Sequence, residues 1–372
     1  MRLKLMLAII GLLLGVAPSS SKADDDATWN RLKPYFEPPA EFAQQFGEYS
    51  SPLKFYDGTP VKDAADWARR RQEILDRWNG LLGKWPALIE RPQLERLEST
   101  RRDNFTQHRI RVEVARGQML DGYLLIPDGQ GPFPAVVVPY YEPETSIGAK
   151  GELRDFALQL ARREFVTIAI GSPGGDARQP DTAETRLQPL SYLGYVAANC
   201  CNALATQPEV DPLRIGIVGH SYGGKWAMFG SCLYDKFACA AWSDGGIVFD
   251  ESRGNVNYWE PWYLGLGEGP KRKSGLITLE NPRTGPYAQL IEQGLDLHEL
   301  HALMAPRPFL VSGGSEDFPA RWIPLIHSIA VNQLLGATHR IGMTNRPTHT
   351  PTVESNEQIC LFFEHFLKPE KR

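Results

Sequence analysis

The chain is poor in cysteine and has no excess of positive charge. Its 372 residues include five cysteines, and 44 acidic residues against 40 basic ones leave a formal charge of -4. A chain without a basic stripe is a poor candidate for binding nucleic acid or an anionic membrane surface, so we expect neither partner. With 42% hydrophobic and 23% charged residues, it has the composition of an ordinary globular protein.

Metal-binding motifs are missing as well. No pair of Cys-x-x-Cys or His-x-x-x-His motifs occurs, so a structural zinc is not supported, and we expect no metal or organic cofactor. An odd number of cysteines cannot all pair within one molecule. Cys200 and Cys201 are adjacent, and Cys232 could reach Cys239 only through a suitable turn. We therefore interpret most of them as small buried hydrophobic residues and leave disulfide pairing open.

The apolar run at the amino terminus is too short for a membrane span. Leu5 to Val16 covers about 12 residues, whereas a spanning helix needs roughly 20. Two positive charges precede the run, and Ser21-Lys22-Ala23 has small residues at the -3 and -1 positions of a cleavage site. This pattern is typical of a secretory signal peptide over residues 1–23. No cysteine follows the run to carry a lipid, so we predict cleavage after Ala23, a periplasmic or secreted location, and no membrane contact afterwards.

Residues 24–104 are predicted to form an N-terminal segment. Residues 24–62 are rich in proline and aromatics without periodicity, which indicates an irregular stretch on the surface of the main domain. From Asp63 to Gly83, apolar residues recur on one face of a helix, with Asp63 as a suitable cap and Gly83 as a suitable stop. We expect this segment to pack on the core of the domain that follows.

Residues 105–372 are predicted to form one α/β domain. An antiparallel hairpin opens it, and strands then alternate with helices up to a terminal helix over 353–367. Such alternation predicts a mostly parallel sheet with helices on both faces. After the sixth predicted strand, residues from about 243 to 300 contain clustered aromatics and glycines without a strand signal. An insertion of this length is usually functional, as a lid or binding loop.

A serine on a sharp turn is the main chemical motif. The buried strand predicted at 214–218 runs into Gly219-His-Ser221-Tyr-Gly223, after which a helical pattern begins. A nucleophile on a tight strand-to-helix turn needs neighbours without a Cβ atom, which Gly219 and Gly223 provide. The start of the helix directs its positive dipole end at the charge that develops on a substrate. Ser221 is therefore the predicted nucleophile; the alternative is a structural turn with a solvated serine.

His349 is the predicted base. A serine hydroxyl needs a base to remove its proton, and in this kind of site the acid and then the base follow the serine in the chain. His349 lies in a polar, Pro-rich loop between the last predicted strand and the terminal helix, where an imidazole can point over the sheet. His339 is the next candidate.

Three carboxylates could orient that histidine. A glycine turn, Ser312-Gly-Gly-Ser-Glu316-Asp317, follows a predicted strand, at the edge where open α/β sheets keep their sites. Asp317 fits the Gly-x-x-Asp spacing and is the preferred acid. Glu316 beside it and Asp244, just after the strand at 238–242, are the alternatives.

Two donors are needed for the oxyanion of acyl transfer. The backbone N–H of Tyr222 follows the nucleophile. The second donor should come from the loop after the strand at 135–138, where Tyr141 or Tyr140 is preferred because Pro139 has no N–H.

Substrate contacts are predicted from the insertion and from the helix after the serine. Trp259 and Trp262 lie in an aromatic cluster that suits stacking on sugar rings, although these side chains could equally pack the insertion onto the core. Lys225 could hydrogen-bond a sugar hydroxyl or carboxylate, or lie on the surface of the helix.

The serine turn, the turn with Asp317, and His349 before a terminal helix resemble the α/β-hydrolase superfamily over about residues 105–368. Within it, the chain is most similar to the branch of dienelactone hydrolases, acetyl xylan esterases and prolyl oligopeptidases. Ser221-Tyr-Gly-Gly-Lys225 resembles the glucuronoyl esterase pattern Ser-Arg-x-Gly-Lys, with Tyr222 in place of the arginine. The resemblance implies the α/β-hydrolase fold and a Ser-His-Asp triad that works through an acyl-enzyme.

These features predict an exported serine carboxylic-ester hydrolase acting on acylated or esterified carbohydrate, with a small-molecule or oligosaccharide ester as substrate. One alternative is a serine peptidase of the prolyl oligopeptidase type, although about 80 residues before the first predicted strand are too few for a propeller. The other alternative is a catalytically inactive binding protein on the same fold. The acyl and alcohol parts of the substrate and the oligomeric state are left open.

Overall fold

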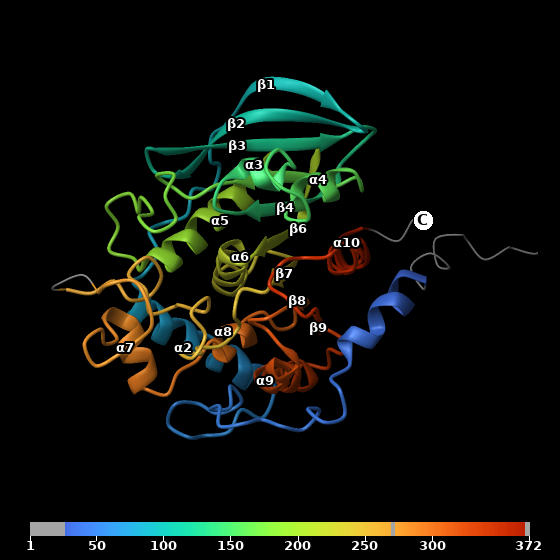
Figure 1. The fold of residues 1–372 in the computed structure, drawn as a ribbon. Coiled ribbons are helices and arrows are strands. Elements are labelled where there is room, and N and C mark those ends of the chain that lie inside the picture. The colour runs from blue at the N-terminus through green and yellow to red at the C-terminus, as the bar shows by residue number, and fades with distance from the viewer. Residues whose placement is uncertain (1–26, 269–271, 369–372) are drawn as a thin grey trace, which may run out of the picture.

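A nine-stranded sheet forms the centre of the molecule (Figure 1). The computed structural model describes residues 27–268 and 272–368, so the predicted signal peptide lies outside the described residues. The strand order is β1-β2-β3-β5-β4-β6-β7-β8-β9. The strands are β1 (Leu94–Arg102), β2 (Phe105–Ala115), β3 (Gln118–Pro127), β4 (Phe133–Pro139), β5 (Val166–Ile170), β6 (Val210–His220), β7 (Cys239–Ser243), β8 (Phe309–Gly313) and β9 (Ile341–Asn345).

The sheet is antiparallel at one edge and parallel elsewhere. Strands β1 to β3 pair antiparallel, β3 pairs antiparallel with β5, and every pair from β5 through β9 is parallel. Strands β5, β7 and β8 are buried along their whole length, as expected for parallel strands covered on both faces. This is the α/β-hydrolase arrangement predicted from the sequence.

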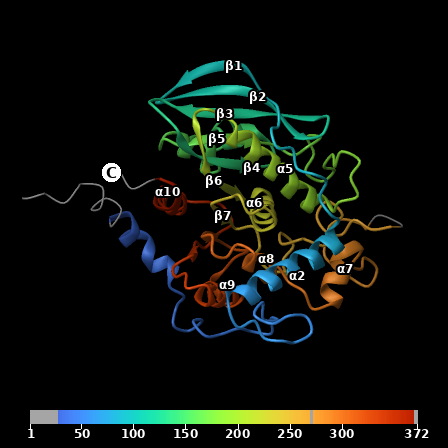
Figure 2. The same cartoon turned by 180° about the vertical axis from the view of Figure 1, so that it is seen from behind.

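Helices cover both faces of the sheet (Figures 1 and 2). On one face, α5 and α6 pack against each other and against the sheet, and α2, α8 and α9 contribute to the same core. On the other face, α4, α10 and η1 close a second core. The helices are η1 (Lys33–Phe36), α2 (Ala64–Leu82), α3 (Pro143–Ser146), α4 (Phe156–Ala161), α5 (Pro189–Ala205), α6 (Tyr222–Leu233), α7 (Gly285–Glu292), α8 (His298–Ala302), η2 (Pro319–Arg321), α9 (Trp322–Leu334) and α10 (Val353–Leu367).

Two long helices follow the sequence signals. Helix α2 begins after Asp63, whose carboxylate accepts the backbone N–H of Asp66 at 2.9 Å, and it ends at Gly83 in a positive-φ conformation. Helix α10 occupies the predicted residues 353–367, and Thr352 caps its start with a reciprocal hydrogen bond to Ser355. Local capping chemistry therefore explains where α2 begins and ends and where α10 begins.

Two elements differ from the prediction. Strand β1 belongs to the sheet, so the sheet begins at Leu94 rather than after residue 104, and the insertion follows the seventh strand rather than the sixth. Seven of the nine β1 side chains are exposed, which removes the alternation that reveals a strand. Helix α9 was not predicted; its side chains are buried on most sides, so it lacks a single apolar face.

The N-terminal segment is joined to the insertion by a buried ion pair. Arg70 on α2 donates to Glu299 on α8 at 2.9 Å, and both side chains are buried. Glu299 also accepts hydrogen bonds from Tyr56 and from the indole of Trp78. The buried Glu299 carboxylate thus has hydrogen-bond donors on both of its oxygens, as a buried charge requires.

All five cysteines are free and buried, so none forms a disulfide. Burial raises the pKa of the Cys201 thiol to about 12, which keeps it protonated. Among the described helices, none has the length and apolar character needed to cross a bilayer.

Candidate active site

Ser221 occupies the sharp turn between β6 and α6. Its backbone φ is 55°, a conformation that a non-glycine residue adopts only under local constraint. The flanking glycines are required by contact: a Cβ on Gly219 would lie 2.1 Å from the carbonyl of Gly223, and one on Gly223 would lie 2.2 Å from the carbonyl of Pro139. The turn therefore presents the hydroxyl at the carboxyl end of the sheet.

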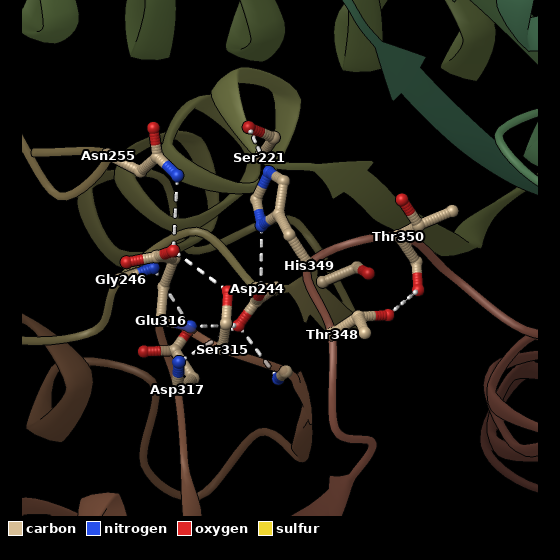
Figure 3. A network of polar contacts seen from close by, with 12 residues as sticks. Ser221, Asp244, Gly246, Asn255, Ser315, Glu316, Asp317, Thr348, His349 and Thr350 are labelled. Carbon is tan, nitrogen blue, oxygen red and sulfur yellow. Dashed lines mark hydrogen bonds and ion pairs between the residues drawn. The ribbon is translucent and has the colours of Figure 1, made fainter.

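A chain of hydrogen bonds joins Ser221, His349 and Asp244 (Figure 3). His349 Nε2 lies 2.8 Å from Ser221 Oγ, and His349 Nδ1 lies 2.7 Å from Asp244 Oδ2. The three residues follow the ends of three parallel strands, β6, β9 and β7. Side chains in this arrangement can act as a nucleophile, a base and an orienting carboxylate.

The predicted acid, Asp317, does not contact His349, and the preference for it over Asp244 is wrong. The Asp317 carboxylate instead accepts the backbone N–H groups of Gly246 and Ile247 at 2.9 and 2.7 Å. Burial, together with the nearby charge of Asp244, raises the pKa of Asp317 above its usual range. Glu316, the other alternative, is hydrogen-bonded to Arg253 and Asn255.

Arg346 ties the His349 loop to the ends of the neighbouring strands. Its Nη2 donates to the carbonyl of His349 at 2.8 Å, and its Nε donates to the carbonyl of Thr350 at 3.0 Å. On the other side, Nη1 donates to the carbonyl of Ser312 at 2.8 Å, and Nη2 reaches the hydroxyl of Ser243 at 3.3 Å. Arg346 is buried, and sequence reasoning missed it because an arginine three residues before a histidine carries no distinctive signal.

His220, just before the nucleophile, is a buried neighbour of the base. Its ring centroid lies 4.7 Å from that of His349, and its Nδ1 lies 3.1 Å from both the carbonyl and the hydroxyl oxygen of Ser243. Burial is the main cause that lowers the pKa of His220 well below its usual value, so this ring stays neutral. His339, the second candidate base, lies near Glu37 instead.

Tyr141 approaches the nucleophile through its side chain. Its side chain lies close enough to Ser221 to interact with it, and its ring stacks on Tyr222 at a centroid distance of 4.7 Å. Burial raises the pKa of Tyr141, so its hydroxyl keeps its proton and can donate. Tyr140 is less suitable as a backbone donor, because its N–H already donates to Ile170 at 3.0 Å. Tyr222 is the first residue of α6, where a backbone N–H has no partner within the helix.

Lys225 is buried, neither on the helix surface nor open to a ligand as the sequence suggested. Its ammonium is buried and donates to the carbonyls of Gly245 and, at 3.2 Å, Asn255. It also lies 4.7 Å from the ring centre of Tyr258. Burial lowers the pKa of Lys225 to about 8. The residue therefore holds the insertion against α6.

The two predicted tryptophans have different environments. Trp259 is buried, and its indole N–H donates to the carbonyl of Gly275 at 2.9 Å, so it packs within the insertion rather than meeting a substrate. Trp262 is half-buried and lines a cavity together with Arg178. In the part of the chain that the structure describes, no group of three His, Cys, Asp or Glu side chains is arranged to hold a metal ion.

Comparison with known proteins gives an esterase and another hydrolase as relatives, although no family model matches the chain. The chain is 23% identical over 355 residues to the 4-O-methyl-glucuronoyl methylesterase of Podospora anserina, covering 86% of this chain and 68% of that protein. It is 22% identical over 218 residues to the 2,6-dihydropseudooxynicotine hydrolase of Paenarthrobacter nicotinovorans, covering 57% and 52%. The solved glucuronoyl esterase of Solibacter usitatus has a TM-score of 0.68 at 17% identity, over 88% of this chain and 100% of that one.

This likeness shows the α/β-hydrolase fold. The resemblance to α/β-hydrolase esterases, with glucuronoyl esterases among them, is confirmed, and the named relatives support a carboxylic ester hydrolase.

Proposed function

We propose that the chain is an exported serine carboxylic-ester hydrolase that cleaves esters of a carbohydrate through an acyl-enzyme. The observation that carries this proposal is the continuous hydrogen-bond chain from Ser221 through His349 to Asp244. The acid of the triad is Asp244, because its Oδ2 is the carboxylate oxygen that meets His349.

In the first step, Ser221 Oγ attacks the ester carbonyl carbon while His349 Nε2 takes the serine proton. The imidazolium donates through Nδ1 to Asp244, which stabilises its charge. The bond to the alcohol then breaks as His349 returns the proton to the leaving oxygen. Water repeats the cycle on the acyl group, again with His349 as base, and releases the acid and free Ser221.

The oxyanion formed at each attack takes two donors. One is the backbone N–H of Tyr222, at the positive end of α6. The other is the hydroxyl of Tyr141, whose side chain interacts with Ser221. This assignment uses the side chain of Tyr141, whereas the sequence predicted a backbone donor at this position.

A carbohydrate ester is the best-supported substrate class. The relative from Podospora anserina is named a 4-O-methyl-glucuronoyl methylesterase, and the solved structure compared above is a glucuronoyl esterase. The N-terminal segment contributes one long helix and an edge strand rather than propeller blades, which favours an esterase over a peptidase of the prolyl oligopeptidase type. No observation favours an inactive binding protein, since nucleophile, base and acid are all in contact.

Export is part of the same proposal, because residues 1–23 have the pattern of a signal peptide. Expression of the full chain in a bacterium and sequencing of the amino terminus of the exported protein test it. A new terminus at Asp24 supports cleavage, whereas a retained Met1 contradicts it.

The activity is tested with residues 24–372 as wild type and as Ser221→Ala, with Ser99→Ala on the remote edge strand as a control. The substrates are para-nitrophenyl acetate, acetylated xylan and a methyl ester of glucuronate. We expect release of acetate or methanol from a sugar substrate that Ser221→Ala abolishes and Ser99→Ala leaves unchanged. Hydrolysis that persists in Ser221→Ala would overturn the mechanism, and hydrolysis of the small ester alone would overturn the carbohydrate assignment.

A further inference from the structure

The cavity lined by Trp262 lies between the loop at 176–186 and the insertion after β7. Its volume is about 490 Å³. We call it the Trp262 cavity; its lining includes Arg178, Gln179, Thr182, Trp262, Leu266 and Arg272. Nothing in the proposed mechanism uses this cavity.

A row of aromatic rings connects the cavity with the nucleophile. It begins at Tyr141, whose side chain lies beside Ser221. Tyr141 stacks on Tyr222, Tyr222 lies 6.2 Å from Tyr263, and Tyr263 lies 6.2 Å from Trp262. Arg178 also lies close enough to Tyr141 for its positive charge to lower the pKa of the Tyr141 hydroxyl. Burial has the larger, opposite effect and raises that pKa. Tyr222 and Tyr263 are buried, so packed rings, rather than an open surface, join the cavity to the reaction centre.

The cavity lining is positively charged. Both of its charged residues are arginines. Arg272 is buried and already neutralised, because Nη1 pairs with Glu260 at 3.1 Å and the other nitrogens donate to backbone carbonyls. Arg178 differs: its guanidinium is exposed and lies 5.7 Å over the ring of Trp262. Within the described residues, its side chain has neither an ion pair nor a hydrogen bond.

The carboxylate two residues before Arg178 in the sequence does not form an ion pair with it. Asp176 accepts the backbone N–H of Arg178 at 2.8 Å and the side-chain amide of Gln179 at 3.3 Å, so it is engaged within its own turn. The Arg178 guanidinium keeps its donors free for a ligand. An aromatic face beside such a guanidinium suits a sugar ring that carries a carboxylate, since the ring stacks while the carboxylate takes paired hydrogen bonds.

We propose that the Trp262 cavity is a subsite for a sugar unit with a free carboxylate, a uronic acid further along the polymer whose ester Ser221 attacks. The sugar ring packs on Trp262, and Arg178 binds the carboxylate. The identity of the polymer rests on the proposed function, but the subsite itself is defined by binding and needs no turnover.

The test measures binding to the Ser221→Ala protein by titration calorimetry. The probes are a xylo-oligosaccharide bearing one free glucuronic acid and the neutral oligosaccharide with the same backbone. We expect the acidic probe to bind about tenfold tighter at low salt, and the difference to shrink as salt is raised. Arg178→Gln should abolish the difference between the probes, while Arg186→Gln, an exposed arginine on the same loop outside the cavity lining, should preserve it.

Equal affinity for the two probes, or a preference for the acidic probe that survives Arg178→Gln, would overturn the proposal. Weakening of both probes by Trp262→Ala supports stacking, and a Trp262→Ala protein that binds both normally would exclude it. Because no step of the titration requires hydrolysis, loss of esterase activity would count against the proposed function alone.

Discussion

Asp244 and Asp317 hold each other's loops. One oxygen of Asp244 accepts three backbone N–H groups from the turn at 314–317, at 2.7 to 3.1 Å. In return, the carboxylate of Asp317 accepts two backbone N–H groups at 246–247, just after Asp244. This exchange fixes Asp244 so that its second oxygen meets His349, 2.7 Å away. Asp317 therefore positions Asp244, the acid of the proposed triad.

The first prediction separates the two carboxylates. Asp244→Asn should lower kcat on para-nitrophenyl acetate by roughly 10³ to 10⁴, because an amide does not stabilise the imidazolium and favours the wrong tautomer. Asp317→Asn should cost only about tenfold in kcat. Its main effect should be a loss of about 1–3 kcal/mol in the free energy of unfolding, because the amide NH₂ meets a backbone donor. The measurements are steady-state kinetics and urea unfolding. A folded Asp317→Asn enzyme as inactive as Asp244→Asn would reinstate Asp317 as the acid.

The choice between these carboxylates marks where sequence reasoning stops. Ser221 could be predicted because the motif, the strand and the helix are all local. His349 could be predicted from its loop and its order in the chain. Two carboxylates at the ends of neighbouring strands look equivalent in a sequence, and the outcome depends on backbone geometry such as the φ of 48° at Asp244. That geometry comes from tertiary contacts.

The same limit applies to the fold and to Lys225. Helices α2 and α10 were predictable from periodicity and caps, whereas β1 is an exposed edge strand whose pairing depends on β2. The position of Lys225 on a helix could be inferred. The contacts of its ammonium with the carbonyls of Gly245 and Asn255 could not be inferred, because both residues belong to an insertion without regular strands.

The second prediction concerns the oxyanion donor. Tyr141→Phe should lower kcat by about 10² to 10³, with a small change in KM, because one donor to the charged intermediate is lost while the ring stack on Tyr222 remains. Tyr140→Phe is the matched control on the neighbouring residue and should retain activity. Equal kcat values for Tyr141→Phe and the wild type would exclude the hydroxyl from this role.

The third prediction concerns Arg346. Arg346→Met removes the hydrogen bonds that join the His349 loop to β7 and β8, so kcat should fall roughly 10- to 100-fold and the free energy of unfolding by about 3 kcal/mol. Arg346→Lys should recover stability in part but kcat less, since an ammonium cannot reproduce the planar fork. Arg340→Met, just before β9 begins, is the control and should keep kcat. An unchanged kcat in a folded Arg346→Met protein would contradict a positioning role.

The last prediction uses the buried ammonium of Lys225. Burial lowers its pKa to about 8 in the folded protein, against about 10.4 for an exposed lysine. Below pH 8 the group is charged in both states, so it contributes no pH dependence. Between about pH 8 and 10.4 the unfolded chain binds more protons, so the free energy of unfolding should rise with pH on account of Lys225.

Lys225→Met should remove that rise. We expect the difference in unfolding free energy between wild type and Lys225→Met to grow by roughly 2–3 kcal/mol from pH 7.5 to pH 10, in favour of the wild type. Urea unfolding at the two pH values measures it, and other titrating groups cancel because both proteins contain them. Lys84→Met, which changes an exposed lysine, should give no such growth. If Lys225→Met folds too poorly, Lys225→Gln serves as the variant instead. A difference in unfolding free energy that stays constant with pH would mean that the ammonium is solvated rather than enclosed by the insertion.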